Sequence, residues 1–213
     1  MPLFVGLLAT LPSGAFSEDA LGPRLMLIAT RQDLQAFLPA DTTLLHDPST
    51  LEKFLAALDG SPPDWAALHG THGDRHDESL FALNRERDRL RAGRKALTQR
   101  ITFFWEGVLS TYIPDKSGFL VAIGPEVIPT RWGLVRFKPE SLPTELVAMP
   151  PADLRESLQA RVARGESVKV VVAMTGRLVP DEAIIYDFAH EDLGQGMIMP
   201  MVRVERIDYL MPP

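Results

Sequence analysis

Residues 101–138 contain the clearest strand pattern in the chain. Bulky apolar side chains alternate with polar ones, and the apolar face carries Ile101, Phe103, Trp105, Leu109 and Ile113. Successive side chains of an extended chain point to opposite faces, so this period of two predicts β-strands. Turn-forming residues at 114–118 and at Gly124 and Pro125 divide the stretch into three consecutive strands. We therefore expect an antiparallel sheet to begin near residue 101.

A helix and further strands are expected after this stretch. Pro151 begins a helical pattern that Gly165 ends, and the β-branched run 167–175 predicts a central strand. Strands are also expected at 183–188 and 199–210, the second with a bulge near Glu205 and Arg206, where its apolar phase shifts. The expected order is thus three strands, then a helix, then two or three further strands. This is the order of a five-stranded Greek-key barrel of the oligonucleotide/oligosaccharide-binding (OB) kind.

The predicted fold class is therefore α+β, with N-terminal helices followed by an antiparallel, OB-like β-barrel of five to six strands. One helix is inserted after the third strand of that barrel. A half-open sheet covered by helices is the alternative, because sequence order does not fix strand pairing. With 213 residues, of which 46% are hydrophobic, the chain is long enough to bury a sizeable core.

The region 16–99 is expected to be mainly helical, and 100–213 barrel-like, with the two packed together as one globular unit. The sharpest helix start is at Asp47, a capping aspartate followed by Pro48 at the first helical position. Leu51, Phe54 and Leu55 follow at helical spacing.

Residues 1–15 resemble the remainder of a signal peptide. The apolar run 3–11 precedes Ser13 and Ala15, small residues placed as an export peptidase requires, although no Lys or Arg precedes the run. We expect a periplasmic or secreted protein, and the alternative is a cytoplasmic protein in which this run is a first strand or buried helical turn. No apolar run approaches the roughly 20 residues that span a bilayer, so no transmembrane segment is expected.

Three histidines, His69, His72 and His76, form the densest group of possible metal ligands. Three imidazoles with an open fourth position would suit a catalytic zinc. However, Gly70 and Gly73 argue against a helix that would align them, and a solvated connection between helices is the competing interpretation. Cysteine is absent from the sequence, which excludes thiolate ligands and disulfides.

Arg85, Arg89 and Trp132 are the candidate ligand-binding residues. Arginines of the predicted helix 77–99 could bind phosphate or carboxylate groups, and strand aromatics such as Trp132 could stack on a base or sugar. In the competing interpretation these arginines form a solvated helix face and the tryptophan belongs to the core.

A non-enzymatic binding or assembly module is the function we expect, with no cofactor and with an unknown protein or small molecule as partner. Nucleic acid is not expected as the partner, because the formal charge is −6. The alternative is a metal-dependent hydrolase that uses zinc at His69, His72 and His76. The sequence contains no phosphate-binding loop and no nucleophile elbow.

Overall fold

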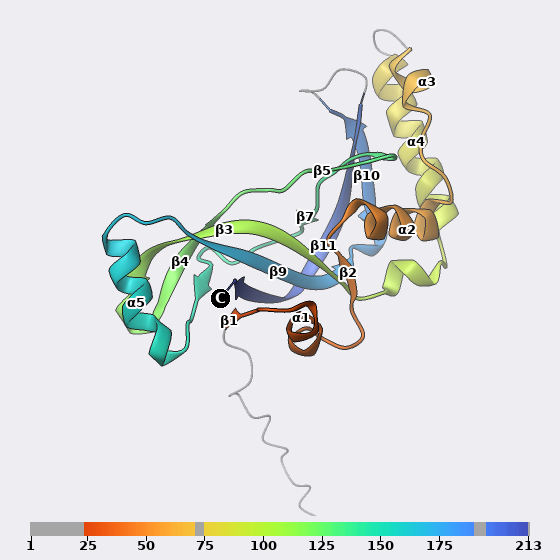
Figure 1. The fold of residues 1–213 in the computed structure, drawn as a ribbon. Helices are drawn as coiled ribbons and strands as arrows, with labels where there is room; N and C mark the ends of the chain where they lie inside the picture. The colour runs from red at the N-terminus through yellow and green to blue at the C-terminus, as the bar shows by residue number, and fades with distance from the viewer. Residues whose placement is uncertain (1–23, 71–74, 190–194, 213) are drawn as a thin grey trace, which may run out of the picture.

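The computed structural model describes residues 24–70, 75–189 and 195–212 of the chain, which form a mixed fold of helices and one sheet of eleven strands. The principal strand order is β5-β6-β11-β9-β3-β4-β8. Three long strands lie side by side in the middle of it (Figure 1), namely β3 (Ile101–Ile113), β9 (Val168–Leu178) and β11 (Gly196–Met211). The predicted alternation is confirmed over 101–109 of β3, where Phe103 and Trp105 are buried and Glu106 is exposed. Ile113 was wrongly predicted on this face, because the register shift between Leu109 and Tyr112 places Tyr112 there instead.

β11 is the strand with the most partners. Along one edge it pairs antiparallel with β9 and with β10 (Ile184–Phe188), which a short 3-10 turn, η4 (Pro180–Glu182), separates. Along its other edge it pairs in parallel with three short strands, β6 (Gly133–Val135), β7 (Lys138–Pro139) and β1 (Leu25–Leu27). The strand therefore holds together segments from the beginning, middle and end of the described chain.

The remaining strands extend the sheet on the side of β3. β4 (Gly118–Ile123) pairs antiparallel with β3, and β8 (Val147–Ala148) with β4. β2 (Thr43–Leu45) pairs in parallel with β3, and β5 (Ile128–Thr130) pairs antiparallel with β6. A 3-10 turn, η3 (Pro114–Lys116), connects β3 to β4.

The predicted OB-like barrel of five to six strands is wrong. The sheet has eleven strands and is not closed into a barrel. The helices do not all precede the strands either, because β1 and β2 flank α1 (Arg31–Phe37). The prediction failed because strands of two or three residues, such as β6, β7 and β8, are too short to show any alternation. Their conformation depends on pairing with segments distant in the sequence.

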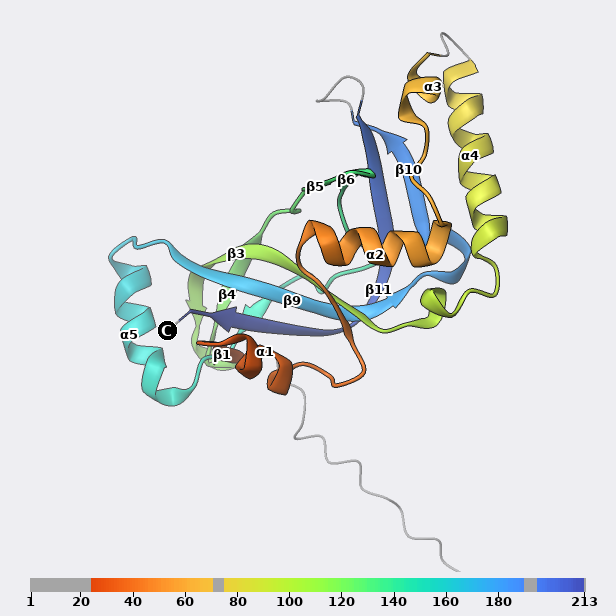
Figure 2. The same ribbon diagram turned by 45° about the vertical axis from the view of Figure 1, so that its right-hand side comes forward.

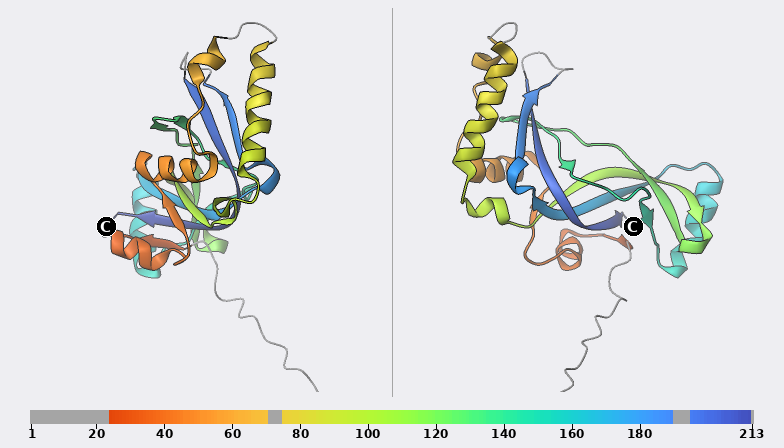
Figure 3. Two further views of the ribbon diagram at one scale, coloured as in Figure 1. Left: turned by 90° about the vertical axis from the view of Figure 1, so that its right-hand side faces the viewer. Right: turned by 180° about the vertical axis from the view of Figure 1, so that it is seen from behind.

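α1 packs on one face of the central strands, and the other helices lie toward the two ends of the sheet. α2 (Pro48–Asp59), α3 (Trp65–His69), α4 (Arg75–Arg91) and the 3-10 turn η2 (Lys95–Thr98) lie at one end, and α5 (Ala152–Ala163) lies at the other (Figures 2 and 3). The start of α2 is confirmed: the Asp47 carboxylate accepts a hydrogen bond of 2.8 Å from the Thr50 backbone N–H. Across 24–70, 75–189 and 195–212, no helix is long and apolar enough to cross a membrane.

Both faces of the central strands are partly covered. The larger core lies on the face toward α2 and includes Phe103, Trp105 and Leu55, whereas a smaller cluster of Leu38, Ala173 and Leu210 lies on the opposite face. Thr102 on that opposite face is fully buried. Its hydroxyl is hydrogen-bonded to the hydroxyls of Thr42 and Thr175, at 2.8 and 2.7 Å, which compensates for its burial.

Candidate functional site

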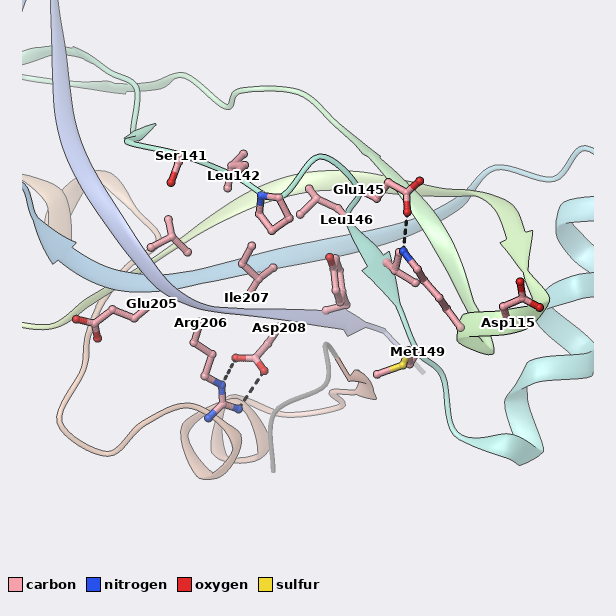
Figure 4. A pocket seen from close by; sticks show the side chains of 15 residues that line it. Asp115, Ser141, Leu142, Glu145, Leu146, Met149, Glu205, Arg206, Ile207 and Asp208 are labelled. Atoms are coloured by element: carbon pink, nitrogen blue, oxygen red, sulfur yellow. Dashed lines mark hydrogen bonds and ion pairs between the residues drawn. The ribbon is translucent and has the colours of Figure 1, made fainter. Parts of the chain in front are cut away.

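A groove runs along β11 on the edge that carries β7 and β1 (Figure 4). Its volume is about 920 Å³. One wall is β11 from Val204 to Tyr209, and the other is the connection that runs from β7 to β8 and on to Met149. We call this cavity the β11 groove.

The backbone of β11 is open toward this groove. β7 pairs with Met201 and Val202, and β1 pairs from Tyr209 onward. The Val202 carbonyl accepts a hydrogen bond from the Glu140 N–H at 2.8 Å, and the Tyr209 N–H donates to the Arg24 carbonyl at 3.2 Å. Within the described residues, no strand pairs with this edge of β11 between these two points, that is, over 203–208. Among the described residues, this stretch of six residues has no partner strand on the groove side, and about half of its residues direct their backbone N–H and C=O groups there, because these groups alternate between the two edges of a strand.

The bulge that the sequence predicted near Glu205 and Arg206 is confirmed, and it shapes the groove. The register of β11 against β9 shifts between Val204 and Arg206, so that Val204 pairs with Gly176 and Ile207 with Met174. Positions 176 and 174 lie on the same face of β9, because they are two residues apart. Val204 and Ile207 consequently share one face although they are three positions apart in the sequence.

The floor of the groove is apolar. Val204, Ile207 and Leu142 are half-buried and pack against the larger core, and Leu146 is buried beside them. Tyr209 is also buried, and this burial raises its pKa to about 12, so its hydroxyl stays protonated at neutral pH. An apolar side chain placed here by a ligand would extend the existing core.

Charged residues also line the groove, although Arg206 and Asp208 direct their side chains to the opposite face of β11 from this floor. Lys116 Nζ lies 2.6 Å from Glu145 Oε2, and Arg206 binds both carboxylate oxygens of Asp208, at 2.7 and 3.0 Å. Asp208 is 4% exposed, and its burial raises the pKa of its carboxyl group despite the adjacent guanidinium. The groove thus combines open backbone groups, an apolar floor and a charged rim, which is the composition of a binding site for an extended chain.

Asp208 gives a prediction about the pH dependence of stability. A carboxyl group with a raised pKa in the folded state binds more protons there than in the unfolded state. The free energy of unfolding therefore falls as pH rises from the ordinary pKa of 3.8 through the raised one. The free energy of unfolding of Asp208→Asn should fall less than that of the wild-type protein as the pH rises above about 4, as measured by urea unfolding at each pH. Parallel curves for the two proteins would contradict this prediction.

The predicted metal-binding histidines are only partly described. His69 ends α3, where its ring lies 4.5 Å from that of Phe188, centroid to centroid. His76 is in the first turn of α4, whereas His72 and the side chain of His76 lie outside the described residues. Among the side chains that are described, no three His, Asp or Glu residues are grouped so that they could hold a metal. Zinc binding by all three histidines stays a prediction.

The predicted ligand-binding residues occupy different environments. Arg85 and Arg89 are exposed on α4, whereas Trp132 is 5% exposed and belongs to the larger core. The backbone carbonyl of Trp132 accepts a hydrogen bond of 2.6 Å from the Trp65 indole N–H. Binding by these residues stays a prediction, but the indole of Trp132 does not offer an open stacking surface.

Sequence reasoning missed the buried arginines of α4. The Arg91 guanidinium binds both Asp59 carboxylate oxygens at 2.6 and 2.9 Å, and Arg87 donates to the Asp59 and Ser61 carbonyls at 2.9 and 2.7 Å. Nothing in the arginine-rich sequence distinguishes these two from exposed Arg85 and Arg89.

The β11 groove was also missed, because its two walls, 204–209 and 141–149, are distant in the sequence and no local pattern brings them together. The shift of apolar phase at Glu205 was the one sequence signal that pointed to this site, since a bulge is frequent beside functional sites.

No protein-family model, no curated protein and no solved structure matches this chain. The function is therefore inferred from the geometry and chemistry of the groove.

Proposed function

We propose that this protein is a non-enzymatic binding module whose ligand is an extended segment of a partner protein. The segment would lie in the β11 groove as an additional strand. The observation that carries this proposal is the edge of β11 over 203–208, which none of the described strands pairs with and which lies between β7 and β1, beside an apolar floor. Addition of a strand to an open sheet edge is a recurrent mode of peptide recognition.

The dimensions of the groove support a short guest strand. Six residues of extended chain span about 20 Å, at about 3.3 Å per residue. Open backbone groups on β11 would bind any sequence of this length, whereas Val204, Ile207 and Leu142 would favour guests with apolar side chains on one face.

The opposite wall limits what can enter. Proteins usually cover or blunt a free strand edge, since an exposed one invites aggregation. Here the connection containing Leu142 and Leu146 faces the edge across the groove (Figure 4). This wall shields the edge of β11 from pairing with the edge of another sheet. This arrangement favours a specific guest over unspecific association.

Peptide binding tests the proposal. We expect a fluorescent, acetylated hexapeptide with valines at alternate positions to bind, as measured by fluorescence anisotropy. Replacing one peptide N–H that faces β11 by N-methyl should weaken binding about fivefold, because a net hydrogen bond contributes about 1 kcal/mol. Moving the methyl group to a neighbouring N–H that points away from β11 should have little effect.

Two variants of the protein serve as a matched pair for this experiment. Leu142→Arg places a charge on the floor of the groove and should abolish binding of the hexapeptide. Phe81→Ser removes an apolar side chain that is 68% exposed on α4, outside the groove, and should leave binding unchanged. Equal affinities of the two variants would contradict a site in the β11 groove.

Export is a further part of the proposal. Residues 1–15, which support it, lie outside the described residues, and the described core begins with Leu25, which is 1% exposed. A chain beginning at Phe16 should therefore unfold within about 0.5 kcal/mol of the full chain in urea, the usual range for changes outside the core. A loss of several kcal/mol would show that residues 1–15 contribute to the core and are not a dispensable leader.

A further inference from the structure

We infer that the guest segment of the β11 groove carries two apolar side chains separated by one residue, with a cationic residue at the end that faces Asp115. This inference rests on the proposed function, because it specifies the chemistry of the segment that the groove would accept. It follows from two separate features, the position of the bulge and the distribution of charge along the rim.

The apolar spacing follows from the bulge. Val204 and Ile207 lie on the same face of β11, opposite positions of β9 that are two residues apart. A regular guest strand places its residues i and i+2 on one face, about 7 Å apart. Such a pair therefore matches Val204 and Ile207, although these are three residues apart in β11. A guest with apolar residues at i and i+3 would direct one of them away from the floor.

The charge preference follows from the end of the groove at η3. Figure 4 shows Asp115 there, beyond the ion pair of Lys116 with Glu145. Asp115 is exposed, and it has no cationic partner in the part of the chain that the structure describes. These three side chains together have a net charge of −1, from two carboxylates and one ammonium group. A cation of the guest would complete this cluster.

The opposite end of the groove has no such surplus of negative charge. Glu205 lies there (Figure 4), and its carboxylate already pairs with Arg100, at 3.3 Å, and with Arg177. Asp208, between the two ends, is bound by Arg206 through both oxygens. The preference for a cation is therefore confined to the Asp115 end, which also gives the guest a direction.

A peptide series tests both features by fluorescence anisotropy at low salt. The parent peptide has two valines separated by one residue, then a lysine within reach of Asp115. We expect the lysine peptide to bind about threefold more tightly than its alanine analogue, the scale of an exposed ion pair, and the glutamate analogue to bind more weakly than alanine. A peptide with two residues between the valines should bind several-fold more weakly than the parent.

Charge reversal in the protein completes the test. Asp115→Lys should invert the preference, so that the glutamate peptide binds more tightly than the lysine peptide. Asp181→Lys changes the net charge equally at an exposed position of η4 and should leave the order lysine, alanine, glutamate unchanged. The urea unfolding curve of each variant would show whether it is folded.

The possible results distinguish a failure of the proposed function from a failure of the inferred guest chemistry. If none of the peptides binds the folded wild-type protein, the proposed function itself is wrong. If the peptides bind in the groove but lysine and glutamate analogues have equal affinity, or Asp115→Lys does not invert their order, the charge inference is overturned. If both valine spacings bind equally well, the inference drawn from the bulge is overturned.

Discussion

Arg91→Ala is expected to lower the free energy of unfolding by about 3–5 kcal/mol, the scale for removing one partner of a buried ion pair. The side chains of Arg91 and Asp59 are 1% and 0% exposed. Without the guanidinium, the Asp59 carboxylate would stay buried with no compensating positive charge in contact, and the Ile184 carbonyl would lose a hydrogen bond of 3.1 Å. Urea unfolding followed by circular dichroism measures this loss.

Tyr186 should increase the destabilisation caused by Arg91→Ala, because it belongs to the same buried hydrogen-bond network. Its hydroxyl also donates a hydrogen bond to Asp59, and burial raises the pKa of Tyr186 well above its usual range, so the phenol remains a donor. Asp59, Arg91 and Tyr186 come from α2, α4 and β10 respectively. Loss of Arg91 should therefore loosen the packing of α4 against the sheet as well as destabilise Asp59.

Two further variants act as controls for Arg91. Arg89→Ala, an exposed arginine of the same helix, should change the free energy of unfolding by no more than about 0.5 kcal/mol. The double variant Asp59→Leu with Arg91→Met should be more stable than Arg91→Ala, because no buried charge is left alone. If Arg89→Ala and Arg91→Ala were equally stable, the buried ion pair would not be a determinant of stability.

Trp105→Ala is expected to lower the free energy of unfolding by about 3–5 kcal/mol, as large-to-small substitutions of core aromatic residues do. Trp105 is 7% exposed in the middle of β3, and its ring packs edge-on against Phe103 at 6.0 Å between centroids. Phe103 in turn stacks on Phe137 at 4.4 Å. The substitution would leave a cavity next to this aromatic cluster, and thermal or denaturant unfolding measures its cost.

Trp105→Phe is the matched control. It retains a ring in the core, and among the described residues the indole nitrogen of Trp105 has no hydrogen-bond partner to lose. Its cost should be clearly smaller than that of Trp105→Ala. If Trp105→Ala unfolded within about 0.5 kcal/mol of the wild type, the core assignment of this residue would be contradicted.

Several elements could be predicted because their signals are local. The alternation in β3, the Asp47 cap of α2 and the bulge at Glu205 each depend on a few consecutive residues. The overall sheet could not be predicted in this way. β1 pairs with the far end of the chain at Tyr209, and β2 pairs with β3 at Ile101, so their conformation depends on partners that sequence order does not reveal.

The position of the candidate site could not be predicted from the sequence. The β11 groove exists because β7 and β1 both pair with one edge of β11 and leave six residues between them. Each of these strands has only two or three residues, and no local pattern specifies where on β11 they bind. The difference between buried Arg87 and exposed Arg85 has the same origin, because it depends on which side of α4 meets Asp59 and Ser61.

The pairing of β11 also determines when the sheet can form during synthesis at the ribosome. Translation proceeds from the N-terminus, and β11 follows β1, β6, β7, β9 and β10, all of which pair with it. Until this strand has emerged, the nascent chain exposes one edge of β9 and the apolar faces that the finished core covers. Such a chain is prone to aggregate and is a natural client for chaperones. The complete sheet should therefore form only after β11 has left the ribosome.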